Sequence, residues 1–136
     1  MPIAHFHLID PTPEQQREVL VRGTQAYAEA FESPVDRIRI FIHTYAPTAA
    51  AVGGVPVAEG APPAPFFNCL AMGGRPIEQQ QRAIVAMTDM LEEVLGVDRS
   101  IIRGLVTEVN PDTWGIAGEP ASKVRAAEIA ARAAES

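Results

Sequence analysis

The hydrophobic positions at the start of the chain alternate with a period of two. Within residues 3–9, Ala4, Phe6 and Leu8 fall on one face and the residues between them fall on the other. This alternation predicts a β-strand that buries one face.

A helix is predicted directly after this strand. Residues 12–15, Thr-Pro-Glu-Gln, match a capping box with proline at the first helical position, and apolar residues follow at helical spacing as far as Phe31. Pro34 is expected to close the helix. Another alternating stretch, from about 37 to 45, predicts a second strand, so the first half of the chain is interpreted as β-α-β.

The second half of the chain repeats this order. Residues 66–72 predict an apolar strand, residues 78–95 a helix with one apolar stripe, and residues 101–109 a further strand. Between the halves, residues 46–64 are rich in Ala, Gly and Pro without a period, which predicts a hairpin or loop that leads into a linker.

Matching residues in the two halves also indicate a tandem duplication. The pairs are Pro2 with Pro65, Arg39 with Arg103, and Gly53-Gly54 with Ala117-Gly118, at offsets of 63 or 64 residues. With 47% hydrophobic residues the chain can bury a modest core. We therefore expect one domain over residues 1–136, with pseudo-repeats at 2–60 and 65–125 and a linker at about 46–64.

The duplicated β-α-β pattern predicts an α+β fold with a four-stranded sheet and two helices on one face. The other face of such a sheet would lack a cover. We therefore expect a closed ring of three protomers that pack their sheets around an axis. The alanine-rich tail, from Ala121 to Ala134, is expected to end in a helix.

Charge and composition narrow the range of partners. The net charge of -6 argues against the broad basic field that nucleic acid or an anionic membrane attracts. There is no leader-like start, and no apolar run approaches the roughly 18 residues that cross a bilayer, so we expect a cytoplasmic protein. The single cysteine, Cys69, lacks an intrachain disulfide partner and is expected to pack inside a strand.

Two stretches of the chain resemble a known superfamily. The opening MPIAHFHLID, the duplicated pattern and the closing WGIAGEPASKVR resemble the 4-oxalocrotonate tautomerase group. The length and the opening, through Ala30-Phe31 and Pro34, also resemble malonate semialdehyde decarboxylase, a duplicated member of the same tautomerase superfamily. The resemblance implies trimeric assembly and an amino-terminal proline that does the chemistry without a metal or cofactor.

Pro2 is the candidate catalytic residue. Removal of Met1 would leave a secondary amine whose reference pKa is about 8, and neighbouring arginines and apolar walls disfavour its protonated form. A neutral amine of this kind can move a proton between atoms of a substrate. Pro65 holds the matching place, but its nitrogen is an amide and cannot act as a base. The alternative for Pro2 is an ordinary proline that starts a strand.

The resemblance points to three arginines as candidates for binding a carboxylate. It implies a substrate-binding role for Arg75 and for Arg39 or Arg103, and a guanidinium can hold a carboxylate through two parallel hydrogen bonds. A small carboxylate-containing substrate is therefore expected. The alternative for Arg75 is a surface ion pair with Glu78 or Glu14. The sequence leaves the choice between Arg39 and Arg103 open, because this site can form across a subunit boundary.

Two further residues take their roles from the resemblance. Trp114 matches the position of an aromatic wall in the tautomerases, and its alternative is a hydrophobic anchor at a subunit interface. Asp36 matches, with a one-residue gap, an aspartate of the decarboxylase that would activate water. The decarboxylase also has a second arginine where this chain has Gly73. The alternative for Asp36 is a residue that caps a loop.

The histidines His5, His7 and His43 are expected to lie at a polar interface or near Pro2. No cluster of Cys, Asp or Glu accompanies them, so a metal site is not expected.

Three functions follow from these residues. The leading one is an isomerase, a tautomerase in which Pro2 acts as general base on an enol or dienol form of a 2-oxo acid. The second is a hydratase or decarboxylase of 3-oxo or unsaturated acids, with a protonated Pro2 and Asp36. The third is a trimeric binding protein that has lost activity, since Thr12 and Ala50 occupy the places that match Arg75 and Trp114.

Overall fold

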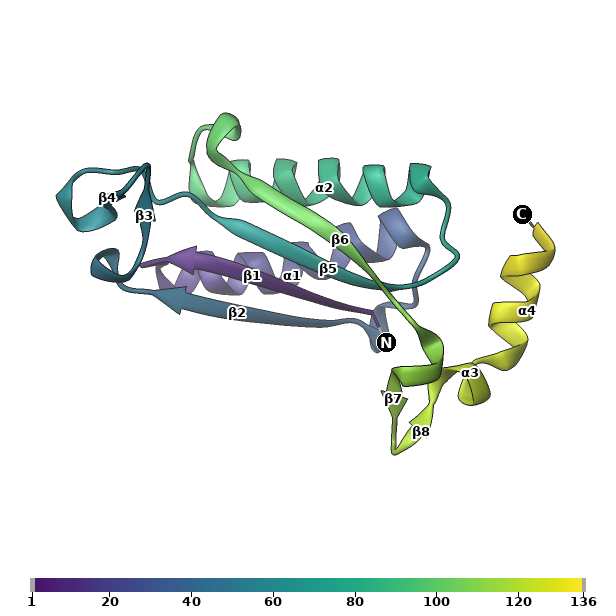
Figure 1. The fold of residues 1–136 in the computed structure, drawn as a ribbon. Coiled ribbons are helices and arrows are strands. Elements are labelled where there is room, and N and C mark those ends of the chain that lie inside the picture. Colours follow the sequence, from purple (N-terminus) through teal and green to yellow (C-terminus); the bar gives the residue numbers. More distant parts are fainter. Residues whose placement is uncertain (1, 136) are drawn as a thin grey trace.

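The computed structural model describes residues 2–135 of the chain. Each half contributes a strand, a long helix and a second strand (Figure 1). These elements are β1 (Ile3–Ile9), α1 (Pro13–Phe31), β2 (Arg39–Tyr45), β5 (Phe66–Met72), α2 (Ile77–Leu95) and β6 (Arg103–Val109). The expected α+β class and four-stranded sheet are confirmed. The expected removal of Met1 lies outside the described residues.

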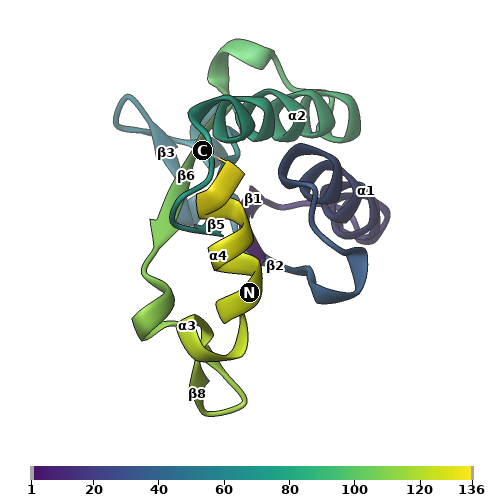
Figure 2. The same cartoon turned by 90° about the vertical axis from the view of Figure 1, so that its right-hand side faces the viewer.

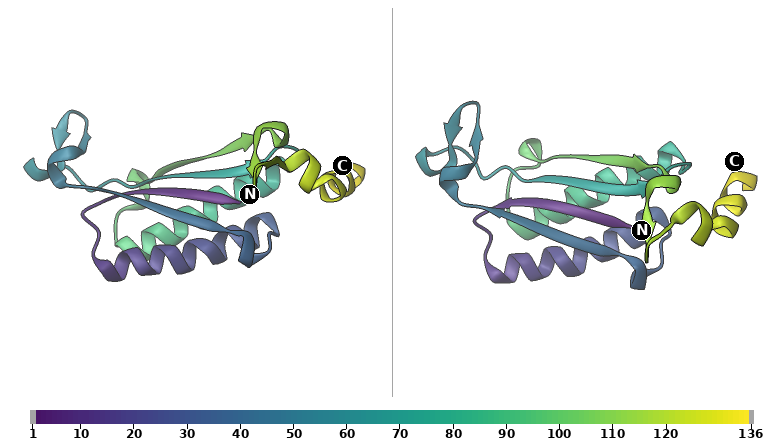
Figure 3. Two further views of the ribbon diagram at one scale, coloured as in Figure 1. Left: turned by 90° about the horizontal axis from the view of Figure 1, so that it is seen from below. Right: turned by 60° about the horizontal axis from the view of Figure 1, so that its bottom comes forward.

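The order of the strands places the two halves side by side in one sheet. The sheet runs β2-β1-β5-β6, with parallel pairs inside each half and an antiparallel pair, β1 and β5, at the centre. As a result, the start of β1 lies beside the end of β5, where Ile3 faces Leu70. Both long helices lie on one side of the sheet, as expected (Figure 3).

The core lies between this helical layer and the sheet. Ala4, Phe6 and Leu8 are buried while their neighbours on β1 are only partly buried, which confirms the alternation. Cys69 is also fully buried, and burial raises the pKa of its thiol to about 12, so the thiol stays protonated. The expected packing role of Cys69 is thus confirmed.

The capping box that the sequence predicts is present at the start of α1. The Gln15 amide donates to the Thr12 hydroxyl oxygen at 3.1 Å, and the Thr12 amide donates to the Gln15 side-chain oxygen at 2.9 Å. At its other end the helix stops at Phe31, before the expected Pro34, because Glu32 adopts a left-handed conformation with φ 51°.

The second strand of each half starts later than the sequence pattern suggests. One turn of 3₁₀ helix precedes each strand, at Val35–Arg37 and at Arg99–Ile101. The strands therefore begin at Arg39 and Arg103, and the predicted starts near Arg37 and Ile101 were wrong. These short turns use the same Val, Ile and Arg types as a strand, so composition does not distinguish the two.

Each half also ends in a small hairpin. The first joins β3 (Ala51–Val52) to β4 (Val55–Pro56), and the second joins β7 (Gly115–Ile116) to β8 (Glu119–Pro120). Both turns place two successive residues at positive φ, which explains why Gly53-Gly54 and Ala117-Gly118 match.

The tail beyond β8 is helical, as predicted. It forms α3 (Ala121–Val124) and α4 (Ala126–Glu135), which lie at the same end of the sheet as the amino terminus (Figure 1). Within residues 2–135, no helix is long and apolar enough to cross a membrane.

Gly104 on β6 faces the ring of its cross-strand neighbour, Phe67. A Cβ at position 104 would lie closer than 3.0 Å to three ring carbons of Phe67, which is fully buried. We expect Gly104→Ala to lower the free energy of unfolding by about 1–3 kcal/mol, because the ring has no space to move into. Urea denaturation measures this change.

Gly115 provides the matched control for this prediction. A Cβ added at Gly115 has no heavy atom within 4 Å, so Gly115→Ala should change stability by less than about 0.5 kcal/mol. Equal stability of the two variants would show that Phe67 does not pack on Gly104 as described.

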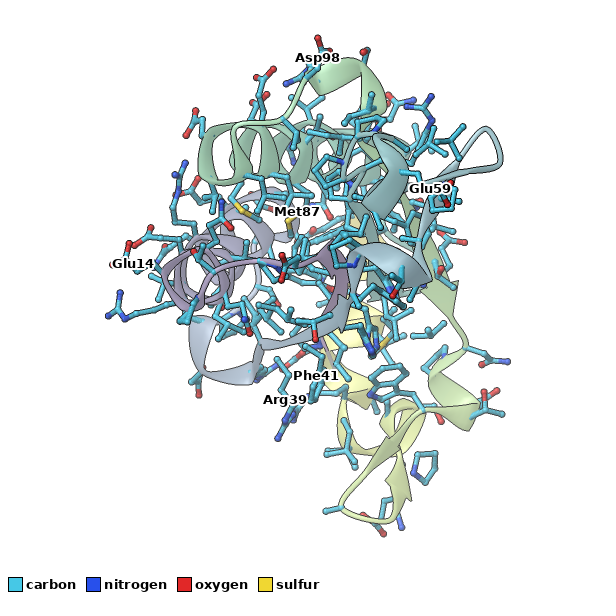
Figure 4. All side chains as sticks on the ribbon, turned by 90° about the vertical axis from the view of Figure 1, so that its left-hand side faces the viewer. Glu14, Arg39, Phe41, Glu59, Met87 and Asp98 are labelled. Atoms are coloured by element: carbon cyan, nitrogen blue, oxygen red, sulfur yellow. The ribbon has the colours of Figure 1, made fainter. Side chains whose placement is uncertain are left out.

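The face of the sheet away from the long helices carries aromatic and histidine side chains. In Figure 4, Met87 lies between the helices and the sheet, whereas Phe41 and Arg39 project from the other face. On this face the ring of His7 lies 4.6 Å from that of His43, and Nδ1 of His5 lies 2.8 Å from Nε2 of His43. The histidines therefore cluster on the open face of the sheet.

This cluster predicts a pH-dependent stability. Desolvation lowers the pKa of His5 and of His7 below the usual 6.5, and repulsion from His43 lowers both pKa values further. The unfolded chain then binds more protons than the folded chain in the range just below 6.5. We expect the free energy of unfolding to fall as the pH drops through about 6.5, with the loss complete once the lowered folded pKa values are passed.

Urea denaturation at fixed protein concentration, followed from about pH 8 to about pH 5.5, measures this loss. His43→Gln should show a smaller loss, because the repulsion from His43 is removed. A loss that is equal in the wild type and in His43→Gln would contradict the role of the cluster.

Candidate active site

The backbone fixes Pro2 at one end of the sheet. Pro2 is buried, and its carbonyl oxygen accepts a hydrogen bond from the Arg39 amide at 3.0 Å. Pro65 makes the matching bond with the Arg103 amide, at 3.3 Å. Since β1 and β5 are antiparallel, these two equivalent corners lie at opposite ends of the sheet.

A cavity of about 530 Å³ opens beside Pro2. Three stretches of chain supply its walls: residues 32–37 after α1, residues 72–79 after β5, and residues 125–135 of the tail. Figure 2 shows α4 lying across the end of the sheet where the amino terminus is found. The cavity therefore combines the start of the chain with its end.

Arg75 is the predicted site residue that the structure brings to this cavity together with Pro2. Its guanidinium donates to the Phe31 carbonyl oxygen and, at 3.2 Å, to Gln79, and it lies 5.3 Å from the centre of the Phe31 ring. Among the described residues Arg75 forms no ion pair with Glu14 or Glu78.

The environment of Arg75 is unusual for an arginine. Burial lowers the pKa of its guanidinium, and the nearby positive charge of Arg132 lowers it further. Its Nε is buried and has no hydrogen-bond partner within residues 2–135. An anion in the cavity would offset the repulsion between the two arginines.

Three other arginines line the cavity, and they are not among the residues predicted from the sequence. Arg37 forms an ion pair with Glu128 at 3.0 Å, and this hydrogen bond raises the pKa of Arg37 and lowers that of Glu128. Arg125 and Arg132 come from the tail. Arg125 is part of the SKVR stretch that carries the family resemblance, which was the only signal available for it.

The remaining predicted residues do not line this cavity. Arg39 begins β2 with its side chain exposed, and Asp36 is exposed in the 3₁₀ turn before β2. Trp114 follows β6 and is partly exposed. Arg103 lies at the opposite end of the sheet, where it donates to the carbonyl oxygens of residues 100 and 102. Their roles in binding substrate stay predictions.

The three histidines do not line the cavity either. Within residues 2–135, no group of three or more His, Cys, Asp or Glu side chains is arranged to hold a metal ion. Among the described residues, the cavity combines the buried Pro2 with four arginines and three glutamates. If the proline amine is free, the arginines favour its neutral form and attract anionic ligands.

The fold and the duplicated corners define a class of protein. The family model for tautomerase enzymes matches the chain twice, over residues 2–60 and over residues 65–123. The chain therefore belongs to the tautomerase enzyme family, as the sequence resemblance indicated.

Individual relatives agree with this assignment. A segment of 60 residues is 30% identical to a 2-hydroxymuconate tautomerase of Pseudomonas sp. (strain CF600), and it covers 43% of this chain and 95% of that protein. A segment of 54 residues is 32% identical to a probable tautomerase of Staphylococcus aureus (strain Mu50 / ATCC 700699), over 40% of this chain and 88% of that one.

Solved structures show the same fold over the greater part of the chain. A native fused 4-OT is similar with a TM-score of 0.85 and 23% identity, over 90% of this chain and 98% of that chain. The F6 fused 4-OT, a wild-type asymmetric trimer, is similar with a TM-score of 0.82 and 20% identity, over the same shares. The fold is thus that of the fused 4-OT proteins.

Proposed function

We propose that this chain is a cofactor-independent tautomerase in which Pro2, freed by removal of Met1, is the general base. The observation that supports this proposal most strongly is the burial of Pro2 beside a cavity that Arg75 also lines. The membership of the tautomerase family supports the isomerase class. The proposed substrate is the enol or dienol form of a small 2-oxo acid.

In the proposed reaction, the neutral Pro2 nitrogen takes the proton from the enol hydroxyl. The electron pair left on the oxygen forms the carbonyl, and the π electrons of the enol take the proton back from Pro2 to form the new carbon–hydrogen bond. In a dienol the second double bond shifts so that this bond forms at the far carbon. Atoms and electrons balance within the substrate, so the step is an isomerisation. Arg75 would hold the carboxylate and stabilise the negative charge that develops on the enolate oxygen.

The open face of the sheet supports a trimer. Phe41, Phe66 and Leu105 lie on this face with 47%, 39% and 40% of their surface exposed, and an apolar face of this kind is usually covered by a partner. One solved relative with this fold is a trimer. We infer that other copies of this chain cover the face, and that Arg39, Arg103 or Trp114 reaches the cavity of a neighbouring copy.

Neither alternative function gains support from the placement of its residues. The hydratase or decarboxylase needs Asp36 at the reacting centre, and Asp36 is exposed outside the cavity lining. The third alternative, a binding protein that has lost activity, predicts that no enol is turned over.

The test is a substrate panel assayed with protein whose amino terminus has been checked by mass spectrometry. We expect a chain that lacks Met1 to ketonise 2-hydroxymuconate or phenylenolpyruvate and to leave 3-oxo acids unchanged. Release of carbon dioxide from a 3-oxo acid without any ketonisation would favour the decarboxylase. Absence of turnover with the whole panel would favour the binding protein.

A further inference from the structure

The tail of the chain forms one wall of the Pro2 cavity, although most of it lies beyond the residues that the family model matches. The family match ends at residue 123, whereas Arg125, Arg132 and Glu128 all line the cavity. No residue of α4 is buried, so the helix gains little from the hydrophobic core. What α4 brings to the cavity is mainly charge.

Two of the three carboxylates that line the cavity already bind other side chains of the protein. Glu128 pairs with Arg37 at 3.0 Å, and Glu32 accepts a hydrogen bond from Gln79 at 3.2 Å. Glu135 also lines the cavity, at the end of α4. In the described part of the chain, four arginines therefore share the cavity with three glutamates, of which one is in an ion pair with an arginine.

The remaining arginines of the cavity form no ion pair within residues 2–135. Arg75 and Arg132 lie close enough for the charge of Arg132 to lower the pKa of Arg75. The Nε atoms of Arg75 and Arg125 are buried without a hydrogen-bond partner among the described residues. A guanidinium that lines a cavity without an acidic partner is an anion-binding group, and a carboxylate is the group that it binds best.

We propose that Arg132, together with Arg125, binds a second carboxylate of the substrate and so determines its specificity. The reacting end of the substrate would lie at Pro2 and Arg75, and the distal carboxylate would lie against the tail. A volume of about 530 Å³ is ample for a short dicarboxylic acid. The choice of reacting end rests on the proposed function, but the second anion subsite does not.

The test measures the binding of unreactive acids, so it is independent of catalysis. The probes are hexanedioate, which has two carboxylates, and hexanoate, which has one, and calorimetry gives the Kd of each. We expect Arg132→Ala to weaken hexanedioate binding about tenfold or more and to leave hexanoate binding unchanged. Arg132→Lys should restore part of the loss, because it keeps the charge without the planar fork.

Arg17→Ala is the matched control, because Arg17 is an exposed arginine on α1, away from the cavity lining, and its side chain is 75% exposed. It should leave both affinities unchanged. If Arg132→Ala weakens the binding of both acids equally, the tail only supports the cavity wall and the proposal is overturned. It is also overturned if the wild type binds hexanedioate no better than hexanoate. If Pro2 proves not to be catalytic while the protein still binds hexanedioate better than hexanoate, only the proposed function is rejected.

Discussion

Replacing Pro2 with alanine is expected to lower kcat for the ketonisation of 2-hydroxymuconate by about 10²–10⁴-fold, which is the usual contribution of a general base. The variant would still carry an amine at its amino terminus, but this amine is primary and free to rotate, whereas the proline ring holds the nitrogen in one direction. KM should change much less than kcat, because Arg75 and the rest of the cavity lining remain. Initial rates followed by absorbance measure both constants.

Pro65→Ala is the control that the duplication itself supplies. Pro65 is fully buried at the matching corner, and its carbonyl accepts the matching hydrogen bond, but its nitrogen is an amide. This variant should keep kcat within about twofold once its folding has been checked, because a proton-transfer role is absent. An undiminished kcat in Pro2→Ala would remove Pro2 from the mechanism.

Arg75→Ala is expected to lower kcat/KM by about 10²–10³-fold, the usual effect of removing one donor that stabilises an oxyanion. The side chain lines the Pro2 cavity and forms no ion pair within residues 2–135, so its positive charge can be matched by an added carboxylate. Arg75→Lys should recover only part of the loss, because an ammonium lacks the paired donors of a guanidinium.

A structural role for Arg75 makes a different prediction. Its bond to the Phe31 carbonyl and its contact with the Phe31 ring also hold the end of α1. Loss of these contacts alone would lower the melting temperature while leaving kcat/KM of the folded protein unchanged. That outcome would contradict the binding role, and parallel measurement of thermal unfolding and kinetics separates the two.

The parts of the fold that could be predicted from sequence are those that depend on neighbouring residues. The alternation of Ala4, Phe6 and Leu8 and the Thr12 capping box each follow from local geometry, and both are present as predicted. The strand starts near Arg37 and Ile101 were wrong, because a 3₁₀ turn and a strand accept the same side chains there.

The parts of the site that could not be predicted depend on which ends of the strands meet. The sequence shows that Arg39 and Arg103 are equivalent. The parallel pairing of β1 and β2 places Arg39 beside Pro2, and only the antiparallel pairing of β1 and β5 places Arg103 at the far end. The cavity wall formed by Arg132 was missed for a similar reason. The sequence pattern of an amphipathic helix at the end of a chain does not indicate against which part of the fold that helix will pack.

The titration of the Pro2 nitrogen tests the central claim most directly. Protein labelled with ¹⁵N-proline allows this nitrogen to be followed by NMR as the pH changes. If Pro2 is the general base, we expect one ionisation with a pKa below about 7, matching the pH at which kcat/KM rises as the neutral base forms. A pKa well above about 8, or a nitrogen that does not titrate because Met1 is retained, would contradict a role for Pro2 as general base.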